Sequence, residues 1–139
     1  MITSIQQVNK TRQQINALRD RLKAPARANV PQHIVAMEKA QVEEKIADLE
    51  SEITEYEAAC NADLNALVFD SYDDFLRTPI ILRLAGGFTL TDFAEQVGIS
   101  LRQLKRYEAE EYRNAPSTVV EEILEHYRLR VSGRISQAS

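Results

Sequence analysis

One short segment in the second half of the chain constrains the fold more than any other. Thr89 precedes a helical run that Gly98 interrupts, and Ser100 precedes a second run, Leu101–Glu108. Threonine and serine are favoured N-caps, and glycine tolerates the left-handed conformation that ends a helix. Apolar or small residues occupy the positions at which two such helices must pack closely: Phe93, Ala94, Val97, Ile99 and Leu104. The sequence therefore predicts a helix, a glycine turn and a second helix that crosses the first steeply.

Further helices are expected on both sides of this frame. Thr78-Pro79 resembles an N-cap followed by proline at the first helical position, and that helix should run through Leu84 and end at Gly86-Gly87. Residues 64–76 break the preceding pattern, and we interpret them as a connector with a short extended piece at Leu67–Phe69.

Composition favours an all-α protein. The 139 residues include only 4 Gly, 4 Pro and no Trp, so a turn-rich β fold is not expected. This length allows one ordinary domain, or one small domain with an elongated element. No nucleophile–base pair or metal-ligand spacing is present, so we expect no enzyme, no catalytic residue, no metal site and no cofactor. The single Cys60 is expected to be a small buried hydrophobe.

The first residues carry no signal-peptide pattern, and nowhere do about 18 apolar residues follow one another. We therefore expect a cytoplasmic protein that has no membrane partner.

The N-terminal half predicts a long antiparallel helical hairpin of coiled-coil type. Apolar residues between Ile5 and Leu22 form one stripe on a helix that Pro25 ends. A heptad pattern follows, with Lys39 and Asp63 as its polar exceptions. Its a and d positions are Val35, Val42, Ile46, Leu49, Ile53, Tyr56, Cys60 and Leu67.

The two helices of this hairpin differ in charge. Residues 3–27 contain six basic residues and one acid, whereas residues 32–66 contain nine acids and two lysines. A basic helix joined to an acidic one by a short loop should fold back on it. Because exposed ion pairs contribute only about 0–1 kcal/mol each, they are expected to set register more than stability.

The second helix is expected to outlast the first, leaving the apolar stripe from Ile46 to Leu67 partly uncovered. A second hairpin is the simplest cover, because two-fold dimers are the commonest oligomers. Packing against the chain's own C-terminal domain is the alternative. The expected domains are a dimerisation hairpin at 1–69 and a second domain at 70–139.

The residues from Phe88 to Tyr112 resemble a known family. Phe88–Ser100, followed by Leu104–Tyr112, is similar to the helix-turn-helix of the phage Cro/repressor-like (XRE) regulators. It is most similar to HigA-type antitoxin relatives, whose third helix also ends in Arg-Tyr-Glu and continues to a tyrosine. The resemblance implies a five-helix, lambda-repressor-like domain whose last helix lies near Ser117–Leu129, and operator binding as a dimer.

The candidate DNA-binding residues follow from this frame. Arg102 and Gln103 are expected to reach base edges in the major groove, and Lys105 and Arg106 to hold phosphates or flanking bases. Arg113 is a further phosphate candidate that could equally pair with Glu110 or Glu111. The remaining candidates lie at helix N-termini, where a phosphate can bind: Thr89, Thr91 and Ser100.

Two functions remain open. The first is a sequence-specific transcriptional repressor that binds an inverted-repeat operator in double-stranded DNA as a homodimer. Family resemblance adds an antitoxin that autoregulates its operon and binds a small basic toxin. The alternative is a protein-interaction module with a degenerate helix-turn-helix and an acidic hairpin for a basic partner. It is supported by Leu90 and Leu101, where the family often has polar residues, and by a net charge of -4. The charge of the face that meets DNA matters more than this total.

Overall fold

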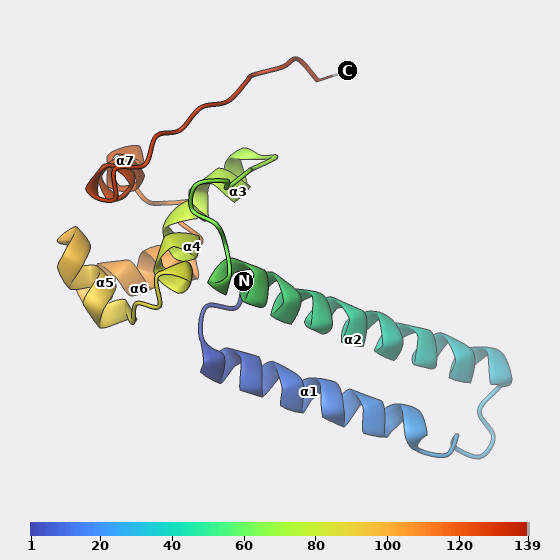
Figure 1. The fold of residues 1–139 in the computed structure, drawn as a ribbon. Helices are drawn as coiled ribbons and strands as arrows, with labels where there is room; N and C mark the ends of the chain where they lie inside the picture. The colour runs from blue at the N-terminus through green and yellow to red at the C-terminus, as the bar shows by residue number, and fades with distance from the viewer. Residues whose placement is uncertain (139) are drawn as a thin grey trace. The chain divides into compact units, whose positions relative to one another are not determined.

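The computed structural model describes residues 1–138, and within that range it contains seven α-helices and no strand (Figure 1). The chain divides into two units, Met1–Asn61 and one that begins at Ala62. This division precedes the boundary at residue 69 that the sequence suggested. Among the described residues, no helix is long and apolar enough to cross a membrane.

The first unit is a pair of antiparallel helices, α1 (Ile5–Lys23) and α2 (Gln32–Cys60) (Figure 1). Helix α1 begins where the Ser4 hydroxyl accepts a hydrogen bond from the Gln7 N–H, and it ends where Ala24 becomes extended ahead of Pro25. The side chains buried between the helices are Ile2, Val8, Ile15, Ile46, Leu49 and Ile53. The Thr11 hydroxyl donates to the Gln7 carbonyl at 2.8 Å, which allows this polar residue to lie in the apolar stripe.

Three ion pairs join the helices along their length. Arg12 pairs with Glu57 at 3.3 Å, Arg19 pairs with Glu50, and Arg27, in the loop, pairs with Glu38 at 3.3 Å. Basic residues of rising number thus meet acids of falling number, as antiparallel register requires.

These ion pairs correct the position of the expected overhang: α2 has 29 residues against 19 in α1, but its extra turns lie at its N-terminal end, beside the loop. Because Arg12 lies opposite Glu57, the first turn of α1 reaches past the last turn of α2, and Ile46, Leu49 and Ile53 are all covered within the chain. The expectation that the heptad helix continues to Leu67 was wrong, since α2 ends at Cys60. Beyond it, the Asp63 carboxylate accepts from the Asn65 N–H at 2.9 Å, and this local turn competes with helix.

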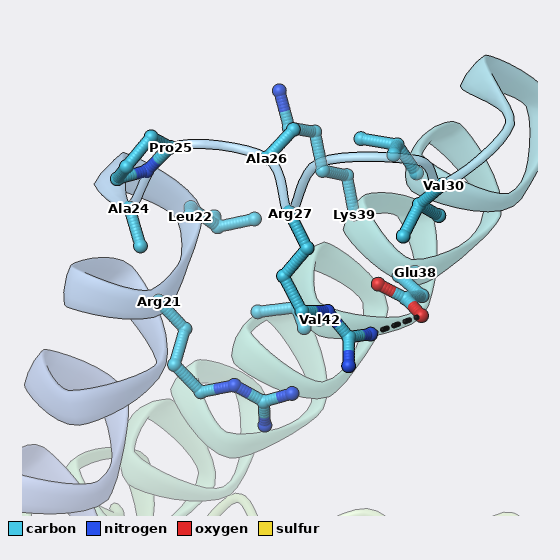
Figure 2. A pocket seen from close by; sticks show the side chains of 11 residues that line it. Arg21, Leu22, Ala24, Pro25, Ala26, Arg27, Val30, Glu38, Lys39 and Val42 are labelled. Atoms are coloured by element: carbon cyan, nitrogen blue, oxygen red, sulfur yellow. Dashed lines mark hydrogen bonds and ion pairs between the residues drawn. The ribbon is translucent and has the colours of Figure 1, made fainter.

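The loop between the helices encloses an open hollow of about 340 Å³ at the tip of the hairpin. Figure 2 shows the Arg27–Glu38 pair as a dashed line among the side chains that line this hollow, and the apolar ones include Leu22, Val30 and Val42. Asn29 in the loop has a φ of 66°, a conformation that asparagine tolerates better than most residues.

The second unit contains the other five helices (Figure 1). They are α3 (Tyr72–Leu76), α4 (Thr78–Ala85), α5 (Leu90–Val97), α6 (Leu101–Ala109) and α7 (Ser117–His126). The core of this unit is formed by Leu76, Ile80, Leu82, Phe93, Ala94, Leu104, Tyr107, Tyr112, Val120, Ile123 and Leu124. The five-helix arrangement agrees with the fold class predicted from the sequence.

The start of this unit differs from the expectation. The connector contains the short helix α3, capped by Ser71, whereas residues 67–69 belong to no helix or strand. Since α3 leads directly into α4, Thr78 is not an N-cap: its hydroxyl donates to the Phe75 carbonyl at 2.6 Å, and Arg77 occupies the cap position. The last helix ends at His126 rather than near Leu129, because Arg128 turns left-handed at a φ of 56°.

Candidate nucleic-acid interface

Helices α5 and α6 are joined by the glycine turn that the sequence predicts. Gly98 has a φ of 72°, and the Ile99 N–H donates to the Ala94 carbonyl at 3.1 Å, which closes the end of α5. The Thr89 hydroxyl accepts from the Asp92 N–H at 3.1 Å, and the Ser100 hydroxyl accepts from the Gln103 N–H at 3.2 Å. Both predicted N-caps are confirmed.

Buried side chains on the facing sides of α5 and α6 fix the position of α6. Phe93 and Leu104 are fully buried, and Ala94 is small enough for close packing at the α5–α6 contact. The Phe93 ring stacks on Tyr127 at a centroid distance of 6.0 Å, which ties α5 to the end of α7. The assignment of Leu104 and Tyr107 to the core is confirmed.

The outer face of α6 carries positive charge. Arg102, Gln103 and Arg106 line one open hollow on this face, and Lys105 is exposed beside them. Across residues 1–138 no carboxylate lies within ion-pair distance of Arg102, Lys105 or Arg106, although the Arg106 guanidinium lies 5.4 Å from the centre of the Tyr107 ring. The structure therefore brings together four of the predicted site residues, and three of them are cations that form no ion pair with an acid of residues 1–138.

Arg113 has a different environment. Its guanidinium pairs with Glu111 at 3.2 Å and lies 3.9 Å from Asp73. Arg77 also pairs with Glu111, at 3.5 Å, so Arg113 belongs to a network that joins α3 and α4 to the loop after α6. Of the two roles that the sequence allowed for this residue, the structure favours pairing with Glu111.

Thr89, Thr91 and Ser100 are all exposed at helix N-termini. The hydroxyls of Thr89 and Ser100 serve as caps, whereas Thr91 lies in the first turn of α5. Leu90 and Leu101 are half-buried at the first positions of α5 and α6. Because Leu101 is apolar and half-buried, the first residue of α6 that can make a polar contact with DNA is Arg102.

Sequence reasoning did not identify the ion pair that fixes the end of α6. Arg83 of α4 and Glu108 of α6 are 5% and 6% exposed, and two guanidinium nitrogens each donate to a Glu108 oxygen at 2.7 Å. Another Arg83 nitrogen donates to the Phe88 carbonyl at 3.1 Å, next to the Thr89 cap. A lone arginine inside the apolar run of α4 was the available signal, because a buried charge requires a partner.

Tyr112 packs beneath this pair. It is fully buried, its ring centre lies 5.8 Å from that of Tyr107, and its hydroxyl has no hydrogen-bond partner among the described residues. Burial, together with the Glu108 carboxylate, raises the pKa of Tyr112 above its ordinary value. Glu111 and Tyr112 both have positive φ, which turns the chain back under α6.

Comparison with protein families agrees with this geometry. Residues 81–133 match the family model described as helix-turn-helix. Comparisons with curated proteins and with solved structures gave no match.

The matched segment covers α5, α6 and α7 and most of α4. The fold and its exposed basic helix thus define a helix-turn-helix protein. Residues 81–133, 53 of the chain's 139 residues, are therefore similar to the helix-turn-helix family.

Proposed function

We propose that this protein is a sequence-specific transcriptional regulator that binds an inverted-repeat operator in double-stranded DNA as a homodimer. The observation that carries the proposal is the set of three cations on α6, Arg102, Lys105 and Arg106, which form no ion pair within the described residues. Their charge is available to DNA phosphates and base edges. In this fold the second helix of the motif enters the major groove.

The three cations are expected to differ in role. Arg102 lies in the first turn of α6, the part of a recognition helix that contacts base edges. Arg106 lies one turn further along, where backbone and flanking contacts compete, and Lys105 is a phosphate ligand. The second unit contains more acids than bases, so affinity depends on this local patch and on two half-sites bound together, roughly 34 Å apart.

A binding titration on two DNAs tests these roles. The DNA upstream of the protein's own reading frame is compared with a scrambled sequence at several salt concentrations, using fluorescence anisotropy. Arg102→Ala should relax base preference and cost about 1–3 kcal/mol on the upstream DNA alone. Lys105→Ala should weaken binding to both DNAs equally and reduce the salt slope by about 1.

Arg113→Ala is the matched control, since it removes one arginine that already pairs with Glu111. It should change affinity for both DNAs far less than Arg102→Ala does. Equal, weak binding of the wild-type protein to both DNAs would contradict sequence-specific regulation.

We further propose that the protein represses its own operon as the antitoxin of a toxin–antitoxin pair. The support is the resemblance of Phe88–Tyr112 to antitoxin relatives. The neighbouring reading frame tests this proposal: co-expression with the adjacent gene product should relieve growth arrest, and a chain with Arg102→Ala should still do so. If co-expression does not relieve growth arrest, the antitoxin proposal is refuted, and the proposal of a DNA-binding regulator is unaffected.

A second candidate function is a protein-interaction module, favoured by one feature of α2. Four of its acids recur at helical spacing, on one face, and none of them forms an ion pair among the described residues: Glu44, Asp48, Glu52 and Glu55. This face fits a basic partner. If the wild-type protein does not discriminate between DNAs, while Asp48→Asn with Glu52→Gln lowers affinity for the basic product of the neighbouring gene, this function replaces the first.

A further inference from the structure

The segment that follows α7 has a pattern that no helix explains. From Leu129 to Ile135, every odd-numbered residue is apolar or glycine and every even-numbered residue is arginine or serine. Strict alternation of this kind is typical of a β-strand with one buried face. Within the described residues this segment forms neither helix nor strand.

Only the first apolar residues of this segment pack against the second unit. Leu129 and Val131 line a groove of the second unit whose other wall includes Leu67, Phe69 and Phe75. A side chain at Gly133 would also face Phe69, at about 4.0 Å. Further along the segment, the apolar side chains are no longer covered by the second unit, since Val131 is 48% exposed and Ile135 is completely exposed.

From Arg130 onward, the backbone of the segment forms no backbone–backbone hydrogen bond within residues 1–138. The last backbone hydrogen bond in residues 1–138 runs from the Leu129 N–H to the Leu124 carbonyl at 2.9 Å. The peptide groups that follow are therefore free to pair with another strand, as at any exposed strand edge.

We propose that residues 130–136 pair with the same residues of a second copy as a two-stranded antiparallel ribbon, and that this ribbon holds the dimer together. Directly opposite residues of an antiparallel pair lie on one face, so apolar residues meet apolar residues only when odd numbers face odd numbers. Centring the pair on Gly133 places Val131 opposite the second copy's Ile135, and this covers the side chain that is fully exposed in one copy.

The arginines select this register among its neighbours. Centred on Gly133, the ribbon places Arg130 opposite Ser136 and Arg134 opposite Ser132. A shift of the centre to Ser132 would place Arg130 opposite Arg134, and a centre at Arg134 would oppose that residue to itself. Like charges directly opposite each other destabilise a pair, so the Gly133 register is preferred.

The distribution of exposed apolar residues favours this dimer over one made by the hairpins. In the described part of the first unit, the large exposed apolar residues are Ile5, Ile34 and Met37, which do not form a stripe. The second unit exposes five, concentrated in the connector, α3 and the last segment: Val68, Phe69, Tyr72, Val131 and Ile135. A two-stranded ribbon is marginal alone, so packing against this apolar surface would stabilise it.

Sedimentation equilibrium of the full chain without DNA is the first test. The wild-type protein should be a dimer at micromolar concentration, and Ile135→Asp should raise the dimer dissociation constant at least about tenfold. Because Ile135 is fully exposed, this change removes no contact within one copy. Met37→Asp changes an exposed apolar residue of the hairpin and should leave the constant unchanged. A monomeric wild-type protein, or an Ile135→Asp protein as dimeric as the wild type, would overturn the proposal.

Cysteine cross-linking tests the register in a Cys60→Ala background. Gly133→Cys should form an intermolecular disulfide readily, since paired Cα atoms at the two-fold axis lie within about 6 Å. Ser132→Cys should link poorly, because the two copies of residue 132 would be about 8 Å apart. Equal linking at both positions would refute the Gly133 register. The inference deepens the proposed dimer but is measured without DNA, so loss of the ribbon and loss of operator binding are separately observable.

Discussion

Removing the Arg83 side chain should destabilise the second unit more than any change on its surface. Arg83→Met keeps an apolar stem in α4 but deletes the two 2.7 Å bonds to Glu108 and the 3.1 Å bond to the Phe88 carbonyl. The Glu108 side chain, which is 5% exposed, would then be buried without a partner. Breaking a buried ion pair in this way costs about 3–5 kcal/mol, a large fraction of the stability of a small domain.

The magnitude follows from desolvation rather than from attraction. In the wild-type protein each charge is removed from water but is compensated by the other, so the net contribution of the pair is small. Replacing both partners, Arg83→Met with Glu108→Leu, should therefore recover most of the loss. Arg83→Lys should recover only part of it, because an ammonium group cannot reproduce the two parallel bonds.

Urea denaturation followed by tyrosine fluorescence measures these differences, since Tyr72, Tyr107, Tyr112 and Tyr127 all lie in the second unit. Arg83→Met should lower the free energy of unfolding by about 3–5 kcal/mol, and the double variant by about 1 kcal/mol or less. The reasoning would be refuted if Arg83→Met cost less than about 1 kcal/mol, or if the losses from the two single variants simply added.

Three further outcomes are expected. Gly98→Ala should lower the free energy of unfolding by about 1–2 kcal/mol, because the φ of 72° is strained for any residue with a Cβ; thermal denaturation measures it. Tyr112 has a raised pKa, so the unfolded state loses its proton first as pH rises above about 10, and stability should fall there. Tyr112→Phe should remove this part of the slope in urea titrations at pH 9 to 11. Reversing the exposed Arg12–Glu57 pair by exchanging the two residues should change stability by less than about 1 kcal/mol.

The sequence was sufficient wherever a local rule decides the structure. Thr89, Gly98 and Ser100 each act within a few residues of themselves, so capping and turn chemistry placed α5 and α6 correctly. The end of α2 was not predicted correctly because a heptad pattern gives no information about local turns that compete with helix. Here the competing turn is the one in which the Asp63 carboxylate accepts a hydrogen bond from the Asn65 N–H. The Thr78 cap failed for a similar reason, since α3 already supplied the preceding turn.

The candidate site divides in the same way. The basic face of α6 could be predicted, because Arg102 and Arg106 are one turn apart in a frame that local signals define. Pairing of Arg113 with Glu111 was one of the roles that the sequence allowed, but its proximity to Asp73 could not be predicted, since that contact joins residues far apart in the chain. The Arg83–Glu108 pair is also a long-range contact, and only the apolar neighbours of Arg83 indicated that it would be buried.

The ion pairs between α1 and α2 reflect a separation of charge between the two helices of the hairpin. With cations concentrated on α1 and acids on α2, the first unit carries a charge separation across its width. A polyanion such as duplex DNA exerts a torque on such an object, turning the basic helix inward and the acidic helix outward. The torque acts only within roughly a Debye length, about 10 Å at 0.1 M salt. Near duplex DNA, the hairpin would therefore present its acidic helix to any protein that approaches from solution.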